Sequence, residues 1–392
     1  MLKRKNSFSP LKHDIRFDKT KHLLKHTLHL FLLFFFIVQF SIAQYYFIVL
    51  DRLTLNPIPF ATIMLNDKKG WVTNDEGQFQ LHKDTPLDSK DTLFLSSLGY
   101  NSLKAENDKI VVAGGQESMT NSPHFIKFRG NEVVTKENLK DTMLVDGLLD
   151  AYNHYHMGVT AENVAEKYNI SRQEQDIFSI SSQKKAKKAY EEKKFKDELI
   201  KLQIQTNNEK FIFEHDEYLR NNINLDDLEK LKTVFKENGT VTPGNSSGLN
   251  DGAAAIVLMT REKAELKSLE ILTNIVSWAS SGVEPSLMGL GPIPSIKEAL
   301  LRAQWKIEDV DLFEINEAFA AQSIAVIREL KIPEEKVNVN GGAIALGHPI
   351  GASGTRILVT LIHELKRQGK KKGCAALCIG GGMGIAMCVE RN

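Results

Sequence analysis

From residue 109 to residue 392, short apolar segments alternate with longer amphipathic ones, and this alternation is the strongest constraint on the fold. Continuous apolar runs predict buried strands, whereas apolar positions at helical spacing predict helices. Strands that alternate with helices are expected to form a mainly parallel sheet covered by helices. The expected strands lie at 109–115 and 253–259 and near Leu312, Val337 and Ala375, and the expected helices at 161–168, 171–194, 296–304, 316–330 and 353–367.

Two of these strands, 109–115 after its first residue Lys109 and 253–259, are apolar, which is typical of strands buried on both faces of a parallel sheet. Thr160 stands where it could cap the first turn of helix 161–168. Asn316 could cap helix 316–330, and capping is the default interpretation of an asparagine at that place.

The composition is that of an ordinary globular protein and excludes several functions. Of 392 residues, 42% are hydrophobic and 25% charged, enough for two or three domains. The formal net charge of +1 creates no field that would attract nucleic acid. The three cysteines, Cys374, Cys378 and Cys388, lie in one apolar stretch, which indicates reduced thiols.

The N-terminal segment argues for a different compartment. A basic stretch at 19–26 leads into the apolar run 28–38, and small residues precede Gln44. This order resembles a secretory signal peptide cleaved after Ala43, and the apolar run is too short for a membrane-spanning helix. A buried core strand or helix is the alternative. Export is therefore expected from this segment, whereas the cysteines favour a cytoplasmic location.

Residues 45–100 contain four short strand-like runs, at 47–50, 61–65, 77–81 and 92–95, separated by turn-forming residues. This spacing predicts an antiparallel β-sandwich. The stretch from Asp51 to Tyr100 resembles the carboxypeptidase regulatory-like domain, a structural or interaction module that carries no catalytic residues. Further strands, usual in that family, do not follow here.

His348 lies in a glycine-rich junction between the expected strand near Val337 and helix 353–367. Such a junction places side chains at the carboxyl edge of a parallel sheet, where ligands bind in open α/β folds. Glycines let the backbone approach a ligand closely, and the free N–H groups of the helix start favour negative charge. A packed histidine in a tight turn is the alternative.

Cys378 ends an apolar strand and is followed, after one residue, by three glycines. A single cysteine is usually a small core side chain. At the glycine-rich end of a strand its sulfur could instead face open space, where backbone N–H groups stabilise a thiolate or an oxyanion. Cys374 and Cys388 are expected in the core, and no metal site is expected because no further ligands are nearby.

Three motifs in this order and spacing resemble the thiolase family, especially its acetyl-CoA acetyltransferases. They are NEAFA at 316–320, NGGAIALGHPIGASG at 340–354 and CIGGGMGIAM at 378–387. Upstream, VVAGGQESM, DEYLR and TVTPGNSSGLNDGAAA match the same family, so the resemblance spans 110–392. It implies a layered α/β thiolase-like fold with an incomplete N-terminal half, preceded by a short β-sandwich fragment.

The resemblance also implies roles for individual residues. His348 would activate the nucleophile and Cys378 would move protons, while Asn316 and the backbone N–H of Gly380 would serve two oxyanion holes. Coenzyme A, as a thioester substrate and not a permanently bound cofactor, would lie along His156, Met157, Arg220, Ser247, Met288 and Phe319, with Arg220 near the adenine. The family further implies a homodimer or homotetramer. Claisen condensation needs a base near the α-carbon and preorganised donors for an enolate, which fits these residue types.

The nucleophilic cysteine of the family has no counterpart in this chain. It would lie shortly before the Ala113-Gly114-Gly115 strand, where this sequence has Ser89 within sandwich-like sequence. About a quarter of the usual fold is missing as well. We therefore expect short-chain acyl-CoA chemistry with little or no turnover, and exposed apolar surface at 110–112.

Three interpretations remain. The first is a thiolase by descent. The second is a non-catalytic protein, either a module that binds CoA or an exported sandwich with a vestigial tail, and the third is a chimeric product joined near Asp108. The expected division is a signal-like segment at 1–44, a truncated sandwich at 45–108, the remainder of a thiolase N-terminal domain at 109–265 and a thiolase C-terminal domain at 266–392.

Overall fold

The computed structural model describes residues 45–48, 61–65, 69–72, 78–81, 93–97, 110–126, 135, 138–205 and 209–392. The chain divides into two compact units, Met1–Glu106 and Asn107–Asn392. The signal-like segment lies outside the described residues. Within the described residues, no helix is both long and apolar enough to cross a bilayer.

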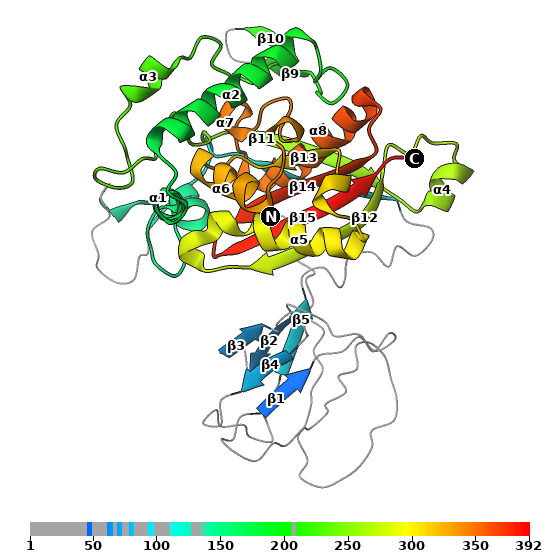
Figure 1. Ribbon diagram of the computed structural model, residues 1–392, viewed down its shortest axis with the longest axis horizontal. Coiled ribbons are helices and arrows are strands. Elements are labelled where there is room, and N and C mark those ends of the chain that lie inside the picture. Colours follow the sequence, from blue (N-terminus) through cyan, green and yellow to red (C-terminus); the bar gives the residue numbers. More distant parts are fainter. Residues whose placement is uncertain are drawn as a thin grey trace. The chain divides into compact units, whose positions relative to one another are not determined.

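The part of the first unit that the structure describes forms five short strands in antiparallel ladders (Figure 1). Strand β1 (Tyr45–Ile48) pairs with β4 (Gln78–Leu81), and β2 (Ala61–Leu65) lies between β3 (Lys69–Val72) and β5 (Leu93–Ser97). The expected antiparallel strands are therefore present, with β3 in addition. The resemblance to a carboxypeptidase regulatory-like domain stays a prediction.

The second unit is built around a four-stranded mixed sheet in the order β12-β15-β14-β13. Its strands are β12 (Asn274–Gly282), β13 (Leu312–Ile315), β14 (Lys372–Ile379) and β15 (Met383–Glu390). Only the β13–β14 ladder is parallel among the described strands, so the expectation of a mainly parallel sheet is wrong. The reason lies in the glycine turn after β14, where Gly381 and Gly382 adopt φ values of +83° and +84° and reverse the chain into β15.

The strands expected at 109–115 and 253–259 form a separate antiparallel pair, β6 (Val111–Glu117) with β11 (Gly252–Leu258). Exposure alternates along both strands, so neither is buried on both faces as a parallel-sheet strand would be. On the outer face Val112 is 71% exposed and Val257 is 60% exposed. The apolar runs therefore reflect one half-buried face and one exposed apolar face.

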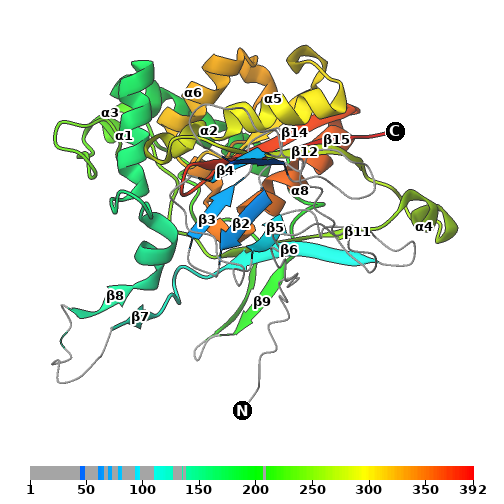
Figure 2. The same ribbon diagram turned by 90° about the horizontal axis from the view of Figure 1, so that it is seen from below.

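Helix α8 (Ile350–Gln368) lies between the two sheets, in contact with β6 and β11 on one side and with β13 and β14 on the other. Helix α5 (Pro292–Ala303) covers the opposite face of the four-stranded sheet at β12 and β15, and Figure 2 shows these layers in succession. Small residues allow the close contact, because a Cβ on Gly115 would stand 1.8 Å from the Gly351 carbonyl oxygen. This layering is the expected layered α/β architecture.

Several helices begin elsewhere than predicted. Helix α1 (Met157–Tyr168) is capped by the His156 ring, and Thr160 instead lies inside its first turn. Helix α2 (Arg172–Glu191) has Ser171 and Glu174 as a reciprocal capping box. Helix α6 (Ala320–Leu330) starts four residues after Asn316, so Asn316 does not cap it. No strand forms at Val337, which makes only an isolated parallel bridge with Phe313.

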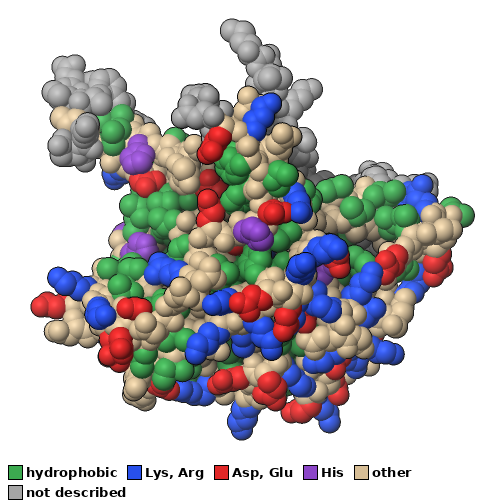
Figure 3. All heavy atoms as spheres, turned by 90° about the horizontal axis from the view of Figure 1, so that it is seen from above, with side chains coloured by type: hydrophobic (Ala, Val, Ile, Leu, Met, Phe, Trp, Pro, Cys, Tyr) green, Lys and Arg blue, Asp and Glu red, His purple; other side chains and the backbone are tan. Residues whose placement is uncertain are grey.

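The remaining elements are short. They are β7 (His124–Phe125), β8 (Lys140–Asp141), η2 (Met143–Leu148), β9 (Leu202–Gln205), β10 (Lys210–Phe213), α3 (Leu225–Glu229), α4 (Arg261–Leu266), η3 (Pro285–Leu290), η4 (Ile307–Asp309), η5 (Glu334–Lys336) and α7 (Ala343–Leu346). Acidic and basic side chains are interspersed on the face shown in Figure 3.

Candidate active site

His348 lies in the short turn between α7 and α8. It directly follows Gly347, whose φ is +100°. Its backbone N–H donates to Asn250 Oδ1 at 3.2 Å. Its ring contacts two polar side chains: Nδ1 lies 2.5 Å from Ser353 Oγ, and Nε2 lies 3.3 Å from Asn316 Nδ2. Each ring nitrogen therefore has one polar side chain within hydrogen-bond distance.

These contacts determine which nitrogen of His348 carries the proton. The single proton of the Ser353 hydroxyl goes to the Pro349 carbonyl oxygen at 2.9 Å, so Ser353 Oγ must accept from His348 Nδ1. Nε2 then accepts from the Asn316 amide. Burial, with a smaller effect of the Arg356 charge, lowers the pKa of His348 to about 4. His348 is thus a neutral imidazole with its Nε2 lone pair toward Asn316.

Asn316 follows directly on β13 and is fully buried. Its backbone N–H donates to the Ala376 carbonyl oxygen at 2.9 Å, which continues the ladder toward β14. Its side-chain Oδ1 is buried and has no hydrogen-bond partner among the described residues. Since buried polar atoms are normally paired, this oxygen can accept a hydrogen bond from a bound water or ligand.

Cys378 lies near the end of β14 and is only 7% exposed. It packs in a cluster with Met157, Met288 and Phe319. The expectation that its sulfur faces open space is therefore wrong, because apolar side chains from three other segments cover this end of the strand. Burial raises the pKa of the Cys378 thiol to about 12, so it is protonated at neutral pH.

The cluster around Cys378 brings together several of the residues expected to contact coenzyme A. Met157, Met288 and Phe319 belong to it, and a Cβ at Gly380 would stand 2.8 Å from the Met157 methyl carbon. The His156 ring stacks on Phe235, with centroids 4.5 Å apart and planes inclined by 18°. Burial lowers the pKa of His156.

Ser247 and Arg220 do not belong to the cluster around Cys378. The Ser247 hydroxyl and N–H both donate to the Ala318 carbonyl oxygen, at 3.1 and 3.0 Å. The Arg220 side chain is exposed, with its guanidinium carbon 5.4 Å from the Tyr218 ring centroid. It belongs neither to the cluster around Cys378 nor to the polar group around His348.

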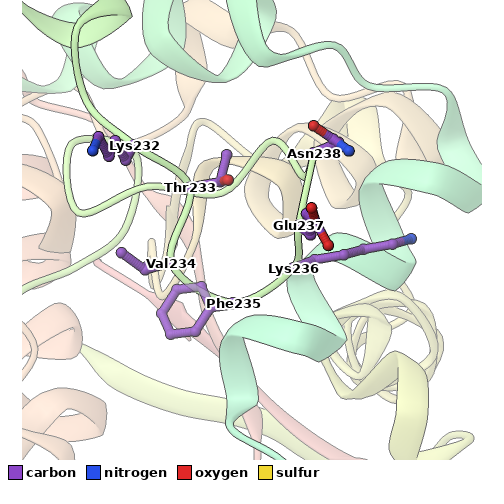
Figure 4. A pocket seen from close by; sticks show the side chains of 7 residues that line it. All are labelled: Lys232, Thr233, Val234, Phe235, Lys236, Glu237 and Asn238. Atoms are coloured by element: carbon purple, nitrogen blue, oxygen red, sulfur yellow. The ribbon is translucent and has the colours of Figure 1, made fainter.

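An open cavity of about 480 Å³ lies next to this cluster and is lined by residues 232–238 of the loop before β11 (Figure 4). Phe235 lines the cavity and also stacks on His156. The Lys236 ammonium pairs with Glu166 at 2.9 Å. The loop therefore connects an open surface to the apolar cluster that holds Cys378.

Sequence reasoning missed Phe235, Asn250 and Ser353. Phe235 lies in an unremarkable polar loop, and no local pattern marks it. Ser353 follows His348 by five residues within the glycine-rich frame, which is the one local signal that could have found it. Within the described residues, no group of three or more His, Cys, Asp or Glu side chains is placed to hold a metal ion.

Comparisons with known proteins show which family the chain is similar to. The family model described as "Thiolase, N-terminal domain" matches residues 97–262, and that described as "Thiolase, C-terminal domain" matches residues 269–391. The acetyl-CoA acetyltransferase of Chromobacterium violaceum is 52% identical over 296 residues, covering 75% of this chain and 76% of that protein. The cytosolic acetyl-CoA acetyltransferase of Rattus norvegicus is 51% identical over 297 residues, with 75% of each chain covered.

Two solved structures are similar in fold as well as in sequence. The Bacillus anthracis acetyl-CoA acetyltransferase superposes with a TM-score of 0.70 at 46% identity, over 72% of each chain. The human mitochondrial 3-ketoacyl-CoA thiolase in complex with CoA gives a TM-score of 0.69 at 41% identity, over 72% of this chain and 71% of that one. The N-terminal and C-terminal domain models of the family both match, and the layered fold is shared with solved relatives. The chain therefore belongs to the thiolase family.

Proposed function

We propose that residues 110–392 form an acyl-CoA site of the acetyl-CoA acetyltransferase type, suited to Claisen condensation and thiolysis of short-chain acyl-CoA. The observation that carries the proposal is the convergence of Asn316, His348 and Ser353 in one hydrogen-bonded group. Relatives about half identical to this chain bear the name acetyl-CoA acetyltransferase. CoA is the substrate thioester, and no permanently bound cofactor is part of the proposal.

The roles follow from the chemistry that thioesters require. A thioester oxygen gains negative charge only in the transition state, so hydrogen-bond donors fixed in advance stabilise it. A water held by the free Asn316 Oδ1 would supply donors for one oxyanion hole. The backbone N–H of Gly380 would supply the donor of a second one. The Cys378 thiol, kept protonated by burial, would give its proton to a carbanion at the α-carbon in thiolysis and recover it in condensation.

The CoA moiety would enter along the loop at 232–238 and the rings of His156 and Phe235. Met157, Met288 and Phe319 would close the acyl end of the site, and their bulk favours short chains. Ser247 and Arg220 are proposed further along the same path, with Arg220 at the adenine. Assembly into a homodimer or homotetramer stays a prediction.

We further propose that turnover is strongly impaired, because no cysteine is available to carry the acyl group. All three cysteines of the chain lie at 374–388. Cys374 and Cys388 pack in the core between the sheet and α5, apart from the cluster that holds Cys378. Removing one member of a coupled catalytic unit can cost several orders of magnitude in rate. Binding of CoA without turnover is therefore the second candidate function.

The test separates binding from catalysis in the purified full-length chain. Calorimetric titration with CoA is expected to show binding, and thiolysis of acetoacetyl-CoA is expected to run several orders of magnitude below the ~10 s⁻¹ of a typical enzyme. Phe235→Ala should weaken binding, whereas Leu301→Ala, which changes a side chain 71% exposed on α5, should not. Thiolysis at an ordinary rate would refute the proposal that turnover is impaired, and so would an acetyl group trapped on a side chain and passed to a second thiol. Absence of CoA binding would refute the proposed acyl-CoA site.

The interpretation of a product joined near Asp108 also remains a proposal. The boundary between the two compact units at Glu106 and Asn107 supports it, although the thiolase match begins earlier, at residue 97. Long-read sequencing across the codons for residues 102–115 tests it directly. A continuous reading frame in independent isolates would show that the two parts belong to one natural chain.

A further inference from the structure

Glu317 directly follows Asn316 and is almost fully buried. Three groups donate hydrogen bonds to its carboxyl group. The Ser182 hydroxyl and the Ile344 N–H donate to Oε2, at 2.6 and 3.2 Å, and Asn338 Nδ2 donates to Oε1 at 2.9 Å. Both carboxyl oxygens of Glu317 are therefore used as acceptors.

Two of these donors, Asn338 and Ile344, belong to the segment that leads to His348. Ile344 lies in α7, and the Gly347 N–H closes this helical turn by donating to the Ala343 carbonyl oxygen at 2.8 Å. The turn ends directly before His348. A displacement of Ile344 is therefore expected to move the backbone that carries the imidazole.

Asn338 also binds the segment that carries Asn316. The Ile315 N–H donates to Asn338 Oδ1, and Asn338 Nδ2 donates to the Ile315 carbonyl oxygen, both at 2.8 Å. Asn316 thus lies between two residues, Ile315 and Glu317, that are both bonded to the Asn338 side chain. The 3.3 Å contact between Asn316 Nδ2 and His348 Nε2 joins the same two segments.

The Glu317 carboxyl group is also closely packed. A Cβ on Gly342 would stand 2.3 Å from its carboxyl carbon, and the Gly342 N–H donates to Ser182 Oγ at 3.0 Å. Burial raises the pKa of Glu317, while the three donated hydrogen bonds and the Lys185 charge counteract this rise. A carboxylate accepts on both oxygens, whereas an amide of the same shape accepts on one only. Glutamine therefore cannot satisfy all three donors.

We propose that Glu317 is a positioning residue that holds the Asn316 amide and the His348 imidazole at hydrogen-bond distance. It does so by binding the segment of residues 338–344 to the chain directly after Asn316, with Ser182 of α2 as the third attachment. The inference rests on the proposed function, because it concerns the geometry in which Asn316 and His348 would act on a thioester.

The experiment follows the Nε2 signal of His348 in the full-length chain at neutral pH. Histidine with a ¹⁵N-labelled ring gives signals for all 11 histidines, and His348→Asn identifies those of interest. A neutral imidazole nitrogen that accepts a hydrogen bond resonates at lower frequency than one without a donor. Asn316→Ala removes the donor and so gives the reference position of the free nitrogen.

Glu317→Gln keeps the shape of the side chain but sets an amide N–H₂ against at least one of the three donors. The Nε2 signal of His348 should therefore move toward the reference position. Ser182→Ala removes only one donor and should move the signal less, in the same direction. If Glu317→Gln does not fold, Ser182→Ala alone decides, and an unmoved signal in that variant overturns the inference.

Glu162→Gln is the matched control. The Glu162 carboxyl group is also buried and accepts hydrogen bonds from the Thr240 N–H, the Thr240 hydroxyl and the Val241 N–H, at 2.8, 2.9 and 2.8 Å. This variant should lose stability as Glu317→Gln does, while the His348 signal stays in place.

Two outcomes contradict the positioning role of Glu317. The first is an Nε2 signal that stays in place in Glu317→Gln although stability falls, since the carboxyl group would then serve the fold alone. The second is an equal displacement of the signal in Glu162→Gln. Because the signal requires neither CoA binding nor turnover, failure of this inference and failure of the proposed function are distinguishable.

Discussion

At the scale of single residues, the candidate site depends on hydrogen-bond capacity more than on charge. Asn316, His348 and Ser353 come from two different segments, and their contacts assign one tautomer to the imidazole. The motif predicts that His348 and Asn316 matter, but it says nothing of Ser353, whose role appears only through its distance from Nδ1. The free Oδ1 of Asn316 is likewise a property of the folded environment.

The contact between Ser353 and His348 predicts a measurable cost. Ser353→Ala leaves the Nδ1 proton of His348 without an acceptor in a buried site, so the free energy of unfolding should fall by about 1–3 kcal/mol. Urea denaturation measures this change, and ¹⁵N shifts of the imidazole should report a mixed tautomer population. Ser323→Ala is the matched control, because the Ser323 hydroxyl is buried without a partner and its loss should be nearly neutral. Equal costs for the two variants would contradict the assignment.

Glu198 predicts a pH dependence of stability. Burial raises its pKa from 4.5 to about 7, so the folded chain binds this proton more tightly than the unfolded chain. The stabilising contribution is complete below pH 4.5, decreases as the pH rises, and is lost once the pH passes about 7; it amounts to ~3 kcal/mol at most. Denaturation between pH 5 and 8 should show a shallower decline in Glu198→Gln. Glu265→Gln changes an exposed side chain and should keep the original dependence of the free energy of unfolding on pH. If Glu198→Gln keeps that dependence as well, Glu198 does not titrate in this range.

At the scale of secondary-structure elements, the positions of helices were largely predictable and the direction of strands was not. Helices α1, α2, α5, α6 and α8 all lie where the periodicity of apolar residues placed them, with starts shifted by up to four residues. Helix α1 starts early because the His156 ring caps it one turn before Thr160. Asn316 does not cap α6 because tertiary contacts with Ala376 and His348 hold it. Whether two strands run parallel or antiparallel depends on which segments pair across a ladder. The apolar content of a strand does not specify its partner.

One element-level contact can be tested through glycine. Gly342 precedes α7, and a Cβ there would stand 2.3 Å from the carboxyl carbon of Glu317. That buried carboxyl group already accepts hydrogen bonds from Ser182, Asn338 and the Ile344 N–H. Gly342→Ala should therefore lower the free energy of unfolding by about 1–3 kcal/mol, as overpacking usually does.

Gly354, within α8, is the matched control for this prediction. A Cβ there would lie 3.9 Å from Leu377, an ordinary contact distance. Gly354→Ala should raise the free energy of unfolding by about 0.5–1 kcal/mol, because alanine loses less backbone entropy in a helix. Thermal or urea denaturation of both variants gives the comparison. A Gly342→Ala variant as stable as the unaltered chain would show that the Glu317 carboxyl group is not fixed there.

At the scale of the whole molecule, the second unit presents an apolar outer face on the β6–β11 sheet. Its outward side chains include Val112 and Val257, which are paired in register across the ladder. The inner face, by contrast, packs on α8, with Ile256 against the cluster around Leu361. Exposed apolar faces of this kind favour association and aggregation.

This asymmetry of the β6–β11 sheet predicts that replacing an aliphatic side chain by threonine costs little stability on the outer face and more on the inner face. Val112→Thr and Val257→Thr keep a β-branched side chain at exposed positions, so the free energy of unfolding should change by less than about 0.5 kcal/mol. Solubility should rise and light scattering should fall. Ile256→Thr on the inner face should cost about 1–2 kcal/mol, because it removes apolar contacts of a half-buried side chain with the cluster around Leu361 and places a hydroxyl there. A comparable cost for Val112→Thr would mean that another part of the protein covers this face in solution.

The sequence by itself determined the family, the approximate positions of the helices and the residue types of the site, since motifs and periodicity are local patterns. The confinement of all cysteines to residues 374–388 was equally visible there. Only the tertiary structure decided that β6 and β11 pair antiparallel, that Cys378 is buried under Met157 and Phe319, and that Ser353 and Phe235 join the site. These features arise where segments far apart in the chain pack together, and their hydrogen-bond registers and burial depend on all partners at once.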